Sequence, residues 1–344
     1  MGTLPVANQF ESFINSFLSF INGCKNTSHS ENIIQILEDR RLTETDKHFV
    51  RILNKLKEQL NKKITFDQII RNNNNIRHIK QYSFVFSLCM SFFHETNINK
   101  KEFIDKRYIA FFSTMLVNRK MRENVKILNW NYDYMLEDAY IKLFDDTNFN
   151  DLEEIRDVLG IKNKFMNPSN EGSIYRLNGS IGYTDKMRRG EYDFHSHKFN
   201  SDLKSDDNLA KKVYIEMLEK YKYTLESFDT INSLLSFSWE ENNDFLNLVK
   251  KSTKQTEKLI IIGYSFPFFN KTIDKAILWP IIENSFNLDI VIQDMEPVNV
   301  KKKLLETLEK TEHMLVNNYN VTFSLMEIRE NNDNFYISNN YINP

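Results

Sequence analysis

Residues 258–265 read Lys-Leu-Ile-Ile-Ile-Gly-Tyr-Ser, an aliphatic run that ends at a glycine. A short, continuous apolar run bounded by a turn residue is typical of a strand buried on both faces of a sheet. Ile273 and Ile277 then recur at helical spacing, so a helix is expected after the turn. The sequence therefore predicts a strand, a turn and a helix, which is the repeating unit of a parallel sheet.

Three further apolar runs have the same plan, and each ends at polar or glycine residues: Val125 to Trp130 before Asn131-Tyr132-Asp133, Ile174 to Leu177 before Asn178-Gly179-Ser180, and Leu288 to Ile292 before Asp294. Helical spacing from Met135 to Phe144 follows the first of them. This alternation predicts an α/β fold with a Rossmann-like parallel sheet and helices on both faces. Ligands of such sheets bind at the carboxyl ends of the strands. We therefore expect Asn131, Asn178 and Gly263 to lie together at that edge.

The N-terminal part has a different pattern, and residues 1–120 are predicted to be mostly helical. Apolar residues at helical spacing indicate helices over Val6 to Phe20, around Ile33 to Leu37, and over Phe49 to Leu60, with a polar break from Arg71 to Asn75. Tyr82 to Phe93 and Tyr108 to Leu116 are dense apolar runs, for which periodicity favours buried helices without excluding strands.

We interpret the chain as one domain with three parts. These are a mostly helical part (1–120), a Rossmann-like core (121–300), and a C-terminal helix and strand (301–344). Within the core, Lys186 to Ser205 is charged and irregular and is expected to form a loop. Leu209 to Leu235 is expected to be helical by its period.

Composition narrows the class of protein. The chain has 344 residues, 41% of them hydrophobic, which is enough for a full core. A net charge of −2 does not suggest a nucleic-acid-binding surface, and no apolar window is long enough to span a bilayer. Two cysteines, Cys24 and Cys89, both in apolar segments, indicate buried thiols in a reducing compartment. These features favour a cytoplasmic protein.

Three segments resemble the sirtuin-like domains of bacterial anti-phage defence proteins, which hydrolyse NAD. They are residues 129–133 (Asn-Trp-Asn-Tyr-Asp), 176–180 (Arg-Leu-Asn-Gly-Ser) and 261–267 (Ile-Ile-Gly-Tyr-Ser-Phe-Pro). In that family the first is typically Thr-Thr-Asn-Tyr-Asp, the second Leu-His-Gly-Ser, and the third Gly-Tyr-Ser before an acidic helix start. The resemblance covers roughly residues 120 to 300, and its strength lies in three motifs in order at strand ends.

The resemblance implies roles for individual residues. Asn131 matches the family asparagine that contacts the ribose next to nicotinamide and helps to place the attacking water, and Asp133 would support its loop. From the residues alone, Asn131 and Asp133 could equally cap the following helix. The implied nucleotide contacts are Gly179, Ser180, Gly263, Tyr264, Ser265 and Asp294. Gly263 allows close backbone approach, and Ser265 can donate to a ribose or phosphate oxygen, although both also suit an ordinary strand-to-helix turn.

Two departures from the family pattern bear on catalysis. Asn178 stands where the family has its catalytic histidine, and a carboxamide does not accept a proton near pH 7. The family also opens with a strand and a Gly-Ala-Gly-x-Ser loop that cradles the pyrophosphate. Gly2-Thr3-Leu4-Pro5 resembles only the tail of that motif, and Met1 to Pro5 is too short for a strand. We therefore expect the first strand and the glycine loop to be missing.

Few residues offer a replacement base or a metal site. His195 and His197 share a charged segment, but two histidines lack the further ligands that zinc requires, so solvated loop histidines are favoured and no metal is expected.

Two functions remain open. The first is hydrolysis of NAD with release of nicotinamide, which in the family depletes NAD during phage infection. The second is a catalytically inactive subunit that binds a nucleotide or a partner protein, and Asn178 and the absent loop favour it. NAD or a derivative is the expected ligand in both cases. A homo-oligomer or a partner defence protein is compatible with both, whereas nucleic acid and membrane are not expected.

Overall fold

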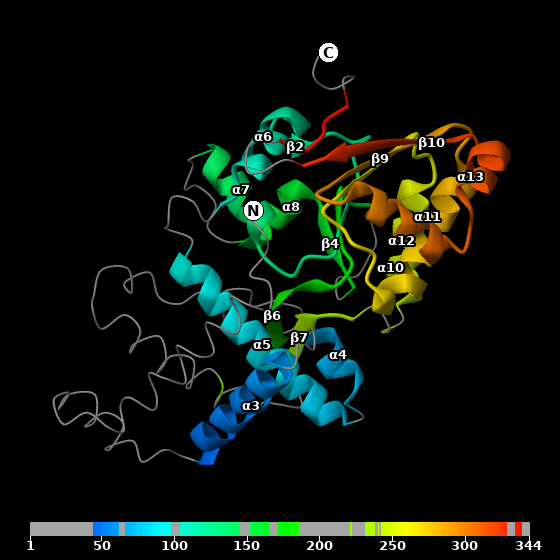
Figure 1. The fold of residues 1–344 in the computed structure, drawn as a ribbon. Coiled ribbons are helices and arrows are strands. Elements are labelled where there is room, and N and C mark those ends of the chain that lie inside the picture. The colour runs from blue at the N-terminus through cyan, green and yellow to red at the C-terminus, as the bar shows by residue number, and fades with distance from the viewer. Residues whose placement is uncertain are drawn as a thin grey trace. The chain divides into compact units, whose positions relative to one another are not determined.

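The computed structural model describes residues 44–61, 66–73, 75–97, 104–144, 152–164, 171–185, 221, 231–237, 240, 242–328 and 334–338. The chain divides into two compact units. The core unit comprises residues 104–179 and 236–344, and the helical unit comprises residues 2–103 and 180–235. Each unit is described by itself, and Figure 1 shows the elements of both.

The first sheet of the core unit is parallel and has the order β3-β5-β4. Its strands are β3 (Ile127–Asn129), β4 (Ile161–Asn163) and β5 (Ile174–Arg176), and Ile174 is paired in register with both Ile127 and Ile161. The helices of this part are α6 (Lys106–Met115), α7 (Met135–Phe144) and α8 (Leu152–Leu159), and a small antiparallel pair joins β1 (Leu116–Val117) to β2 (Lys120–Met121).

These elements form because one face of each is apolar. Phe112 and Met115 of α6, Leu136 and Tyr140 of α7, and Leu159 of α8 are buried in one cluster with Ile161 and Ile174 of the sheet. The predictions of a strand before Asn131, a strand at Ile174 and a helix from Met135 to Phe144 are confirmed. Tyr108 to Leu116, for which helix and strand were both open, is a helix to Met115.

The second sheet of the core unit is also parallel and has the order β10-β9-β8. Ile260 of β8 is paired with Val291 of β9, and Val291 with Ser324 of β10. The strands are β8 (Lys258–Ile262), β9 (Leu288–Asp294) and β10 (Val321–Glu327), accompanied by helices α10 (Asn243–Thr253), η3 (Phe268–Asn270), α11 (Lys271–Asn284), α12 (Pro297–Leu308) and α13 (Glu312–Tyr319). The predicted strands at residues 258 and 288 and the helix through Ile273 and Ile277 are confirmed.

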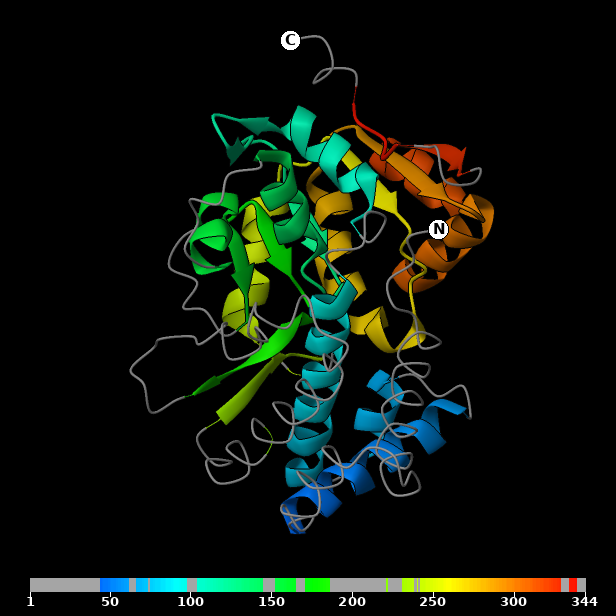
Figure 2. The same ribbon diagram turned by 90° about the vertical axis from the view of Figure 1, so that its left-hand side faces the viewer.

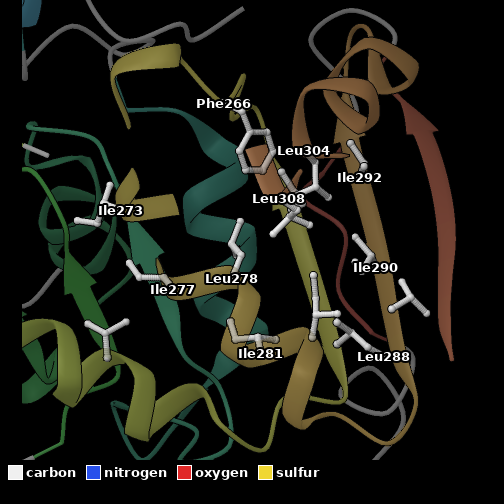
Figure 3. Packing of buried hydrophobic residues seen from close by; sticks show 14 of the residues in the cluster. Phe266, Ile273, Ile277, Leu278, Ile281, Leu288, Ile290, Ile292, Leu304 and Leu308 are labelled. Carbon is white, nitrogen blue, oxygen red and sulfur yellow. The ribbon is translucent and has the colours of Figure 1, made fainter. Parts of the chain in front are cut away.

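The second sheet is held to its helices by a dry apolar cluster. Leu288, Ile290 and Ile292 alternate along β9 and so share one face, and Figure 3 shows them near Leu304 and Leu308 of α12. Tyr175 and Leu177, which belong to β5 and its end, are buried in the same cluster. The cluster therefore joins both sheets into one unit with the mixed α/β, Rossmann-like character that the sequence predicts.

In the helical unit, α3 (Glu44–Asn61), α4 (Phe66–Arg71) and α5 (Ile76–Asn97) confirm the predicted helices from Phe49 to Leu60 and from Tyr82 to Phe93, with a break after Arg71. The same unit contains β6 (Gly179–Asp185) and β7 (Ile231–Leu235), which pair with each other and lie beside α5 in Figure 2. The helix expected over Leu209 to Leu235 is therefore wrong at its end. Ile231, Leu234 and Leu235 satisfy a helical spacing, but pairing with β6 extends the chain.

Several predictions fall outside the described residues. These are the helices over Val6 to Phe20 and around Ile33 to Leu37, the missing first strand at Met1 to Pro5, and the loop from Lys186 to Ser205. Among the helices that the structure describes, none is both long and apolar enough to cross a membrane.

Candidate functional site

The loop after β3 carries Asn131, which is half-buried. Its backbone N–H donates to Oδ1 of Asn129 at 2.7 Å, which fixes the turn where the strand ends. The Asn131 side chain contacts the hydroxyl group of Tyr108 on α6. Burial raises the pKa of Tyr108 well above its ordinary value, and this contact lowers it in part. The carboxamide of Asn131 is thus held from one side by α6.

Asp133 is buried and lies two residues before the start of helix α7. Its Oδ1 accepts the backbone N–H of Met135 at 3.0 Å, so the helix-capping role that the sequence left open is present. Capping also fixes the course of the loop from Asn131 into the helix. Both interpretations of Asp133 are therefore compatible with the structure.

The buried side chain of Arg176 holds the same loop through hydrogen bonds. The Nη1 group of Arg176, the last residue of β5, donates to the backbone carbonyl oxygens of Asp133 at 2.6 Å and Asn131 at 3.3 Å. Its Nη2 group donates to Oε2 of Glu137, and Arg156 donates to Oε1 of the same carboxylate at 3.0 Å. Arg176, Glu137 and Arg156 thus form a buried charge cluster under the Asn131 loop.

Two guanidinium groups share one carboxylate in this cluster. Glu137 has no exposed surface, and Arg176 and Arg156 are 1% and 2% exposed. Burial raises the pKa of Glu137, but the two arginines outweigh it and hold that pKa below its ordinary value. Burial also raises the pKa of the neighbouring Tyr134 to about 12, so this phenol stays neutral. The two arginines therefore keep Glu137 ionised at neutral pH, and its carboxylate positions Arg176.

Asn178 follows β5 and is buried. Its side-chain Nδ2 group donates to the backbone carbonyl oxygen of Trp130 at 3.1 Å, and its backbone carbonyl oxygen accepts the backbone N–H of Ser236 at 2.9 Å. Asn178 therefore fastens the Asn131 loop to the end of β5. Its carboxamide makes a structural hydrogen bond and does not supply a general base.

Trp130 and Tyr264 bring the ends of the two sheets together. Trp130 directly follows β3 and Tyr264 lies just after β8, and their rings stack with centroids 4.4 Å apart and planes inclined by 26°. Phe266, which has a positive φ of 50°, meets the edge of Tyr264 at 4.9 Å between centroids. The carboxyl ends of β3, β5 and β8 are thus linked by direct side-chain contacts.

The hydroxyl group of Tyr264 lies in a buried polar chain. It donates to the carboxyl group of Asp274 on α11, with distances of 2.8 and 3.0 Å to the two oxygens, and it accepts from Nδ2 of Asn270 at 2.9 Å. Burial raises the pKa of Asp274 to about 7, although the hydrogen bond from Tyr264 lowers it in part. The indole N–H of Trp130 lowers it further, without the alignment of a full hydrogen bond.

Gly263 offers an open stretch of backbone at the end of β8. It is exposed and has a φ of 60°, and a Cβ atom added there would meet nothing within 4 Å. Its backbone N–H donates to the backbone carbonyl oxygen of Gln293 at 3.1 Å, which fixes the position of Gly263 beside β9. Ser265, two residues on, is also exposed. A ligand can approach this backbone closely, as the sequence suggests.

The remaining expected contacts are less closely grouped. Gly179 and Ser180 begin β6, where the chain leaves the core unit for the helical unit. Asp294 ends β9, where its carboxylate accepts the backbone N–H of Glu296 at 2.9 Å. The structure therefore joins Asn131, Asp133, Asn178 and Tyr264 through shared contacts, with Gly263 and Ser265 adjacent to Tyr264 in the chain.

Sequence reasoning missed Arg176, Glu137 and Asp274. Arg176 left a signal, because a charged residue inside the apolar run from Ile174 to Leu177 requires a buried partner. Asp274 gave only a weak signal, since an aspartate in the first turn of a helix is ordinary.

Metal ligands are not gathered anywhere in the part of the chain that the structure describes, where no group of three or more histidine, cysteine, aspartate and glutamate side chains could hold an ion. His195 and His197 lie outside that part. Comparison of the chain with family models, curated proteins and solved structures finds no match.

Proposed function

We propose that the chain binds NAD or a derivative at the carboxyl ends of β3, β5 and β8, and that it hydrolyses NAD with release of nicotinamide. The observation that carries this proposal is the meeting of the three motif loops, in which Asn178 binds the carbonyl oxygen of Trp130 and Trp130 stacks on Tyr264. These are the segments that resemble the sirtuin-like domains, and their contacts are those of one site.

The residues at this edge suit a dinucleotide. The open backbone at Gly263 suits a close approach by a sugar or phosphate, and the exposed hydroxyl of Ser265 is a donor for their oxygens. Asn131 offers a carboxamide that can both donate to and accept from a ribose hydroxyl. We assign Asn131 the central polar role, with Asp133 and Arg176 holding its loop.

Hydrolysis at this site does not require a histidine for bond cleavage. The bond between ribose and nicotinamide breaks through an oxocarbenium-like state, in which departure of the leaving group carries much of the reaction. The loss of a general base typically costs a factor of about 10² to 10⁴ in rate. We therefore expect slow turnover. In the family that the motifs resemble, such turnover depletes cellular NAD during phage infection, and we extend that role to this chain.

A second candidate is a silent subunit that binds the nucleotide or a partner protein without cleaving it. The observation in its favour is the commitment of the Asn178 carboxamide to the backbone of Trp130. Such a residue stabilises a loop and moves no proton. A silent subunit that binds the nucleotide shares the site of the first candidate and differs from it only in turnover.

One pair of measurements separates them. The purified chain is incubated with NAD and released nicotinamide is measured, while calorimetry measures the binding of ADP-ribose. Hydrolysis that disappears in Asn131→Ala and persists in Asn317→Ala, a change at an exposed asparagine on α13, supports the first candidate. Binding without hydrolysis supports the second. A chain that neither binds ADP-ribose nor hydrolyses NAD refutes the first candidate and the nucleotide-binding form of the second.

A further inference from the structure

Asp274 is an unusual carboxyl group. It lies in the first turn of α11 with no exposed surface, and a buried aspartate normally has a cationic partner. Its hydrogen-bond donor is instead the neutral hydroxyl of Tyr264, with the indole of Trp130 close by. The lysines of its own helix, Lys271 and Lys275, are both paired with Glu309.

The surroundings of Asp274 contain no compensating charge among the described residues. The β8 loop contributes Tyr264, the β3 loop contributes Trp130, and η3 contributes Asn270 through the Tyr264 hydroxyl. Helices α10 and α12, which pack against α11, contribute apolar residues such as Phe245 and Leu304. The charge state of this carboxyl therefore depends on burial and on neutral hydrogen bonds.

A short chain of contacts leads from Asp274 to the Asn131 loop. Tyr264 donates to Asp274 through its hydroxyl and stacks on Trp130 through its ring. The carbonyl oxygen of Trp130 is held by Asn178, and Asn131 is the next residue. Any rearrangement at the Tyr264 hydroxyl thus reaches the loop through one aromatic contact.

We propose that Asp274 is a positioning residue, and that gain or loss of one proton at its carboxyl group shifts Tyr264, the stacked Trp130 and the Asn131 loop together. The ionised carboxylate accepts a strong, charge-assisted hydrogen bond from Tyr264. The protonated form carries its own O–H and competes to donate to the Tyr264 oxygen, which already accepts from Asn270. The two forms therefore present different donors and acceptors to one hydroxyl group.

The shift occurs near neutral pH, because burial raises the pKa of Asp274 to about 7. The effect of Asp274 on ligand binding rests on the proposed nucleotide site. The conformational change does not, because the fluorescence of Trp130 reports it without any ligand.

The test is a pH titration of tryptophan fluorescence from pH 5.5 to 8.5 with the full chain. We expect a transition with a midpoint near 7 that disappears in Asp274→Asn and in Trp130→Phe. It should persist in Trp279→Phe, whose indole contacts Tyr319, and in Asp289→Asn, whose carboxylate pairs with Lys258. Absence of a transition in the unaltered chain, or its survival in Asp274→Asn, would overturn the proposal.

A second variant and a binding measurement keep the test decisive even if Asp274→Asn folds poorly. Tyr264→Phe keeps the ring and removes the hydroxyl through which Asp274 acts on Trp130, so the transition should lose most of its amplitude. A transition of full amplitude in this variant contradicts the mechanism even where Asp274→Asn folds poorly. In the ligand arm, the affinity for ADP-ribose should change several-fold between pH 6 and pH 8 and become constant in Asp274→Asn. An ADP-ribose affinity that does not change with pH in the unaltered chain, as in Asp274→Asn, overturns the coupling between Asp274 and the ligand site. ADP-ribose that fails to bind at every pH refutes only the proposed function, and the fluorescence result still decides the role of Asp274.

Discussion

The indole ring of Trp130 lies on the phenol ring of Tyr264, with centroids 4.4 Å apart. The two residues follow strands β3 and β8, which belong to separate three-stranded sheets with no hydrogen-bonded pair between them among the described strands. Side-chain packing therefore joins the carboxyl ends of these sheets. The same contact carries the link from the buried carboxyl group of Asp274 to the Asn131 loop.

The buried cluster of Glu137, Arg156 and Arg176 leads to a first prediction, on stability. Glu137→Gln leaves two guanidinium groups buried without their anion, which should lower the free energy of unfolding by about 3–5 kcal/mol. Glu312→Gln, at an exposed ion pair with Lys301, should cost about 1 kcal/mol or less. Urea unfolding measures both, and equal effects would contradict a structural role for the cluster.

The pH dependence of this contribution has a definite sign. The pKa of folded Glu137 lies below its ordinary value of 4.5. Its stabilisation is therefore complete above pH 4.5 and is lost as the pH falls through the lower folded value. The stability difference between the unaltered chain and Glu137→Gln should shrink in acid.

Asp274 gives a second prediction, of opposite sign. Its folded pKa of about 7 exceeds the ordinary 3.8, so the folded chain holds this proton more tightly than the unfolded chain. Its contribution is full below pH 3.8 and is lost as the pH rises to about 7, by an amount on the order of 4 kcal/mol. Asp274→Asn, which stays neutral, should therefore gain stability relative to the unaltered chain between pH 5 and pH 8. A difference that is independent of pH over that range would show that Asp274 titrates normally.

A third prediction concerns Asn178, which fastens the Asn131 loop to the end of β5. In Asn178→His, one ring nitrogen can donate to the Trp130 carbonyl as Asn178 does, and the other is left as a base. Nicotinamide release should rise, by up to about 10² to 10⁴-fold if the rest of the site is competent. Asn178→Ala removes the hydrogen bond, should cost about 1 kcal/mol of stability, and should give no gain in rate. Unchanged turnover in Asn178→His, with ADP-ribose still bound, would show that a base at this position is not what limits the reaction.

Much of the fold could be predicted from the sequence because the strands of the core are short apolar runs that stop at polar residues. The runs before Asn131, Asn178 and Gly263 are strands β3, β5 and β8, as the pattern indicates. The helical period of Leu209 to Leu235 predicts a helix that includes Ile231 to Leu235. These residues form strand β7 because they pair with β6, and no local pattern reveals that pairing.

The site was less accessible to prediction, since its polar partners are far apart in the chain. Arg176 and Glu137 are 39 residues apart, and Asn178 binds the carbonyl of a residue 48 positions earlier. Asp274 becomes distinctive only when the Tyr264 hydroxyl is placed on it. Motif spacing identified the loops, and three-dimensional packing identified the residues that hold them.

The last prediction uses two glycines to separate ligand binding from folding. Gly263 has a φ of 60°, and a Cβ atom there meets nothing within 4 Å, so Gly263→Ala costs only the backbone strain of a left-handed residue, about 1–2 kcal/mol. At Gly172 a Cβ atom would lie 2.5 Å from the carbonyl oxygen of Gly160 and 2.6 Å from the Lys162 side chain. Gly172→Ala must therefore displace the backbone at Gly160, which directly precedes β4. We expect Gly172→Ala to be the more destabilising of the two in urea unfolding.

If a nucleotide rests against the open backbone of Gly263, the methyl group added in Gly263→Ala occupies the place of the ligand. Gly263→Ala should then weaken ADP-ribose binding at least tenfold while the chain stays folded. Gly172→Ala, measured at a temperature where it is still folded, should bind as the unaltered chain does. Full affinity in Gly263→Ala would remove the end of β8 from the proposed site.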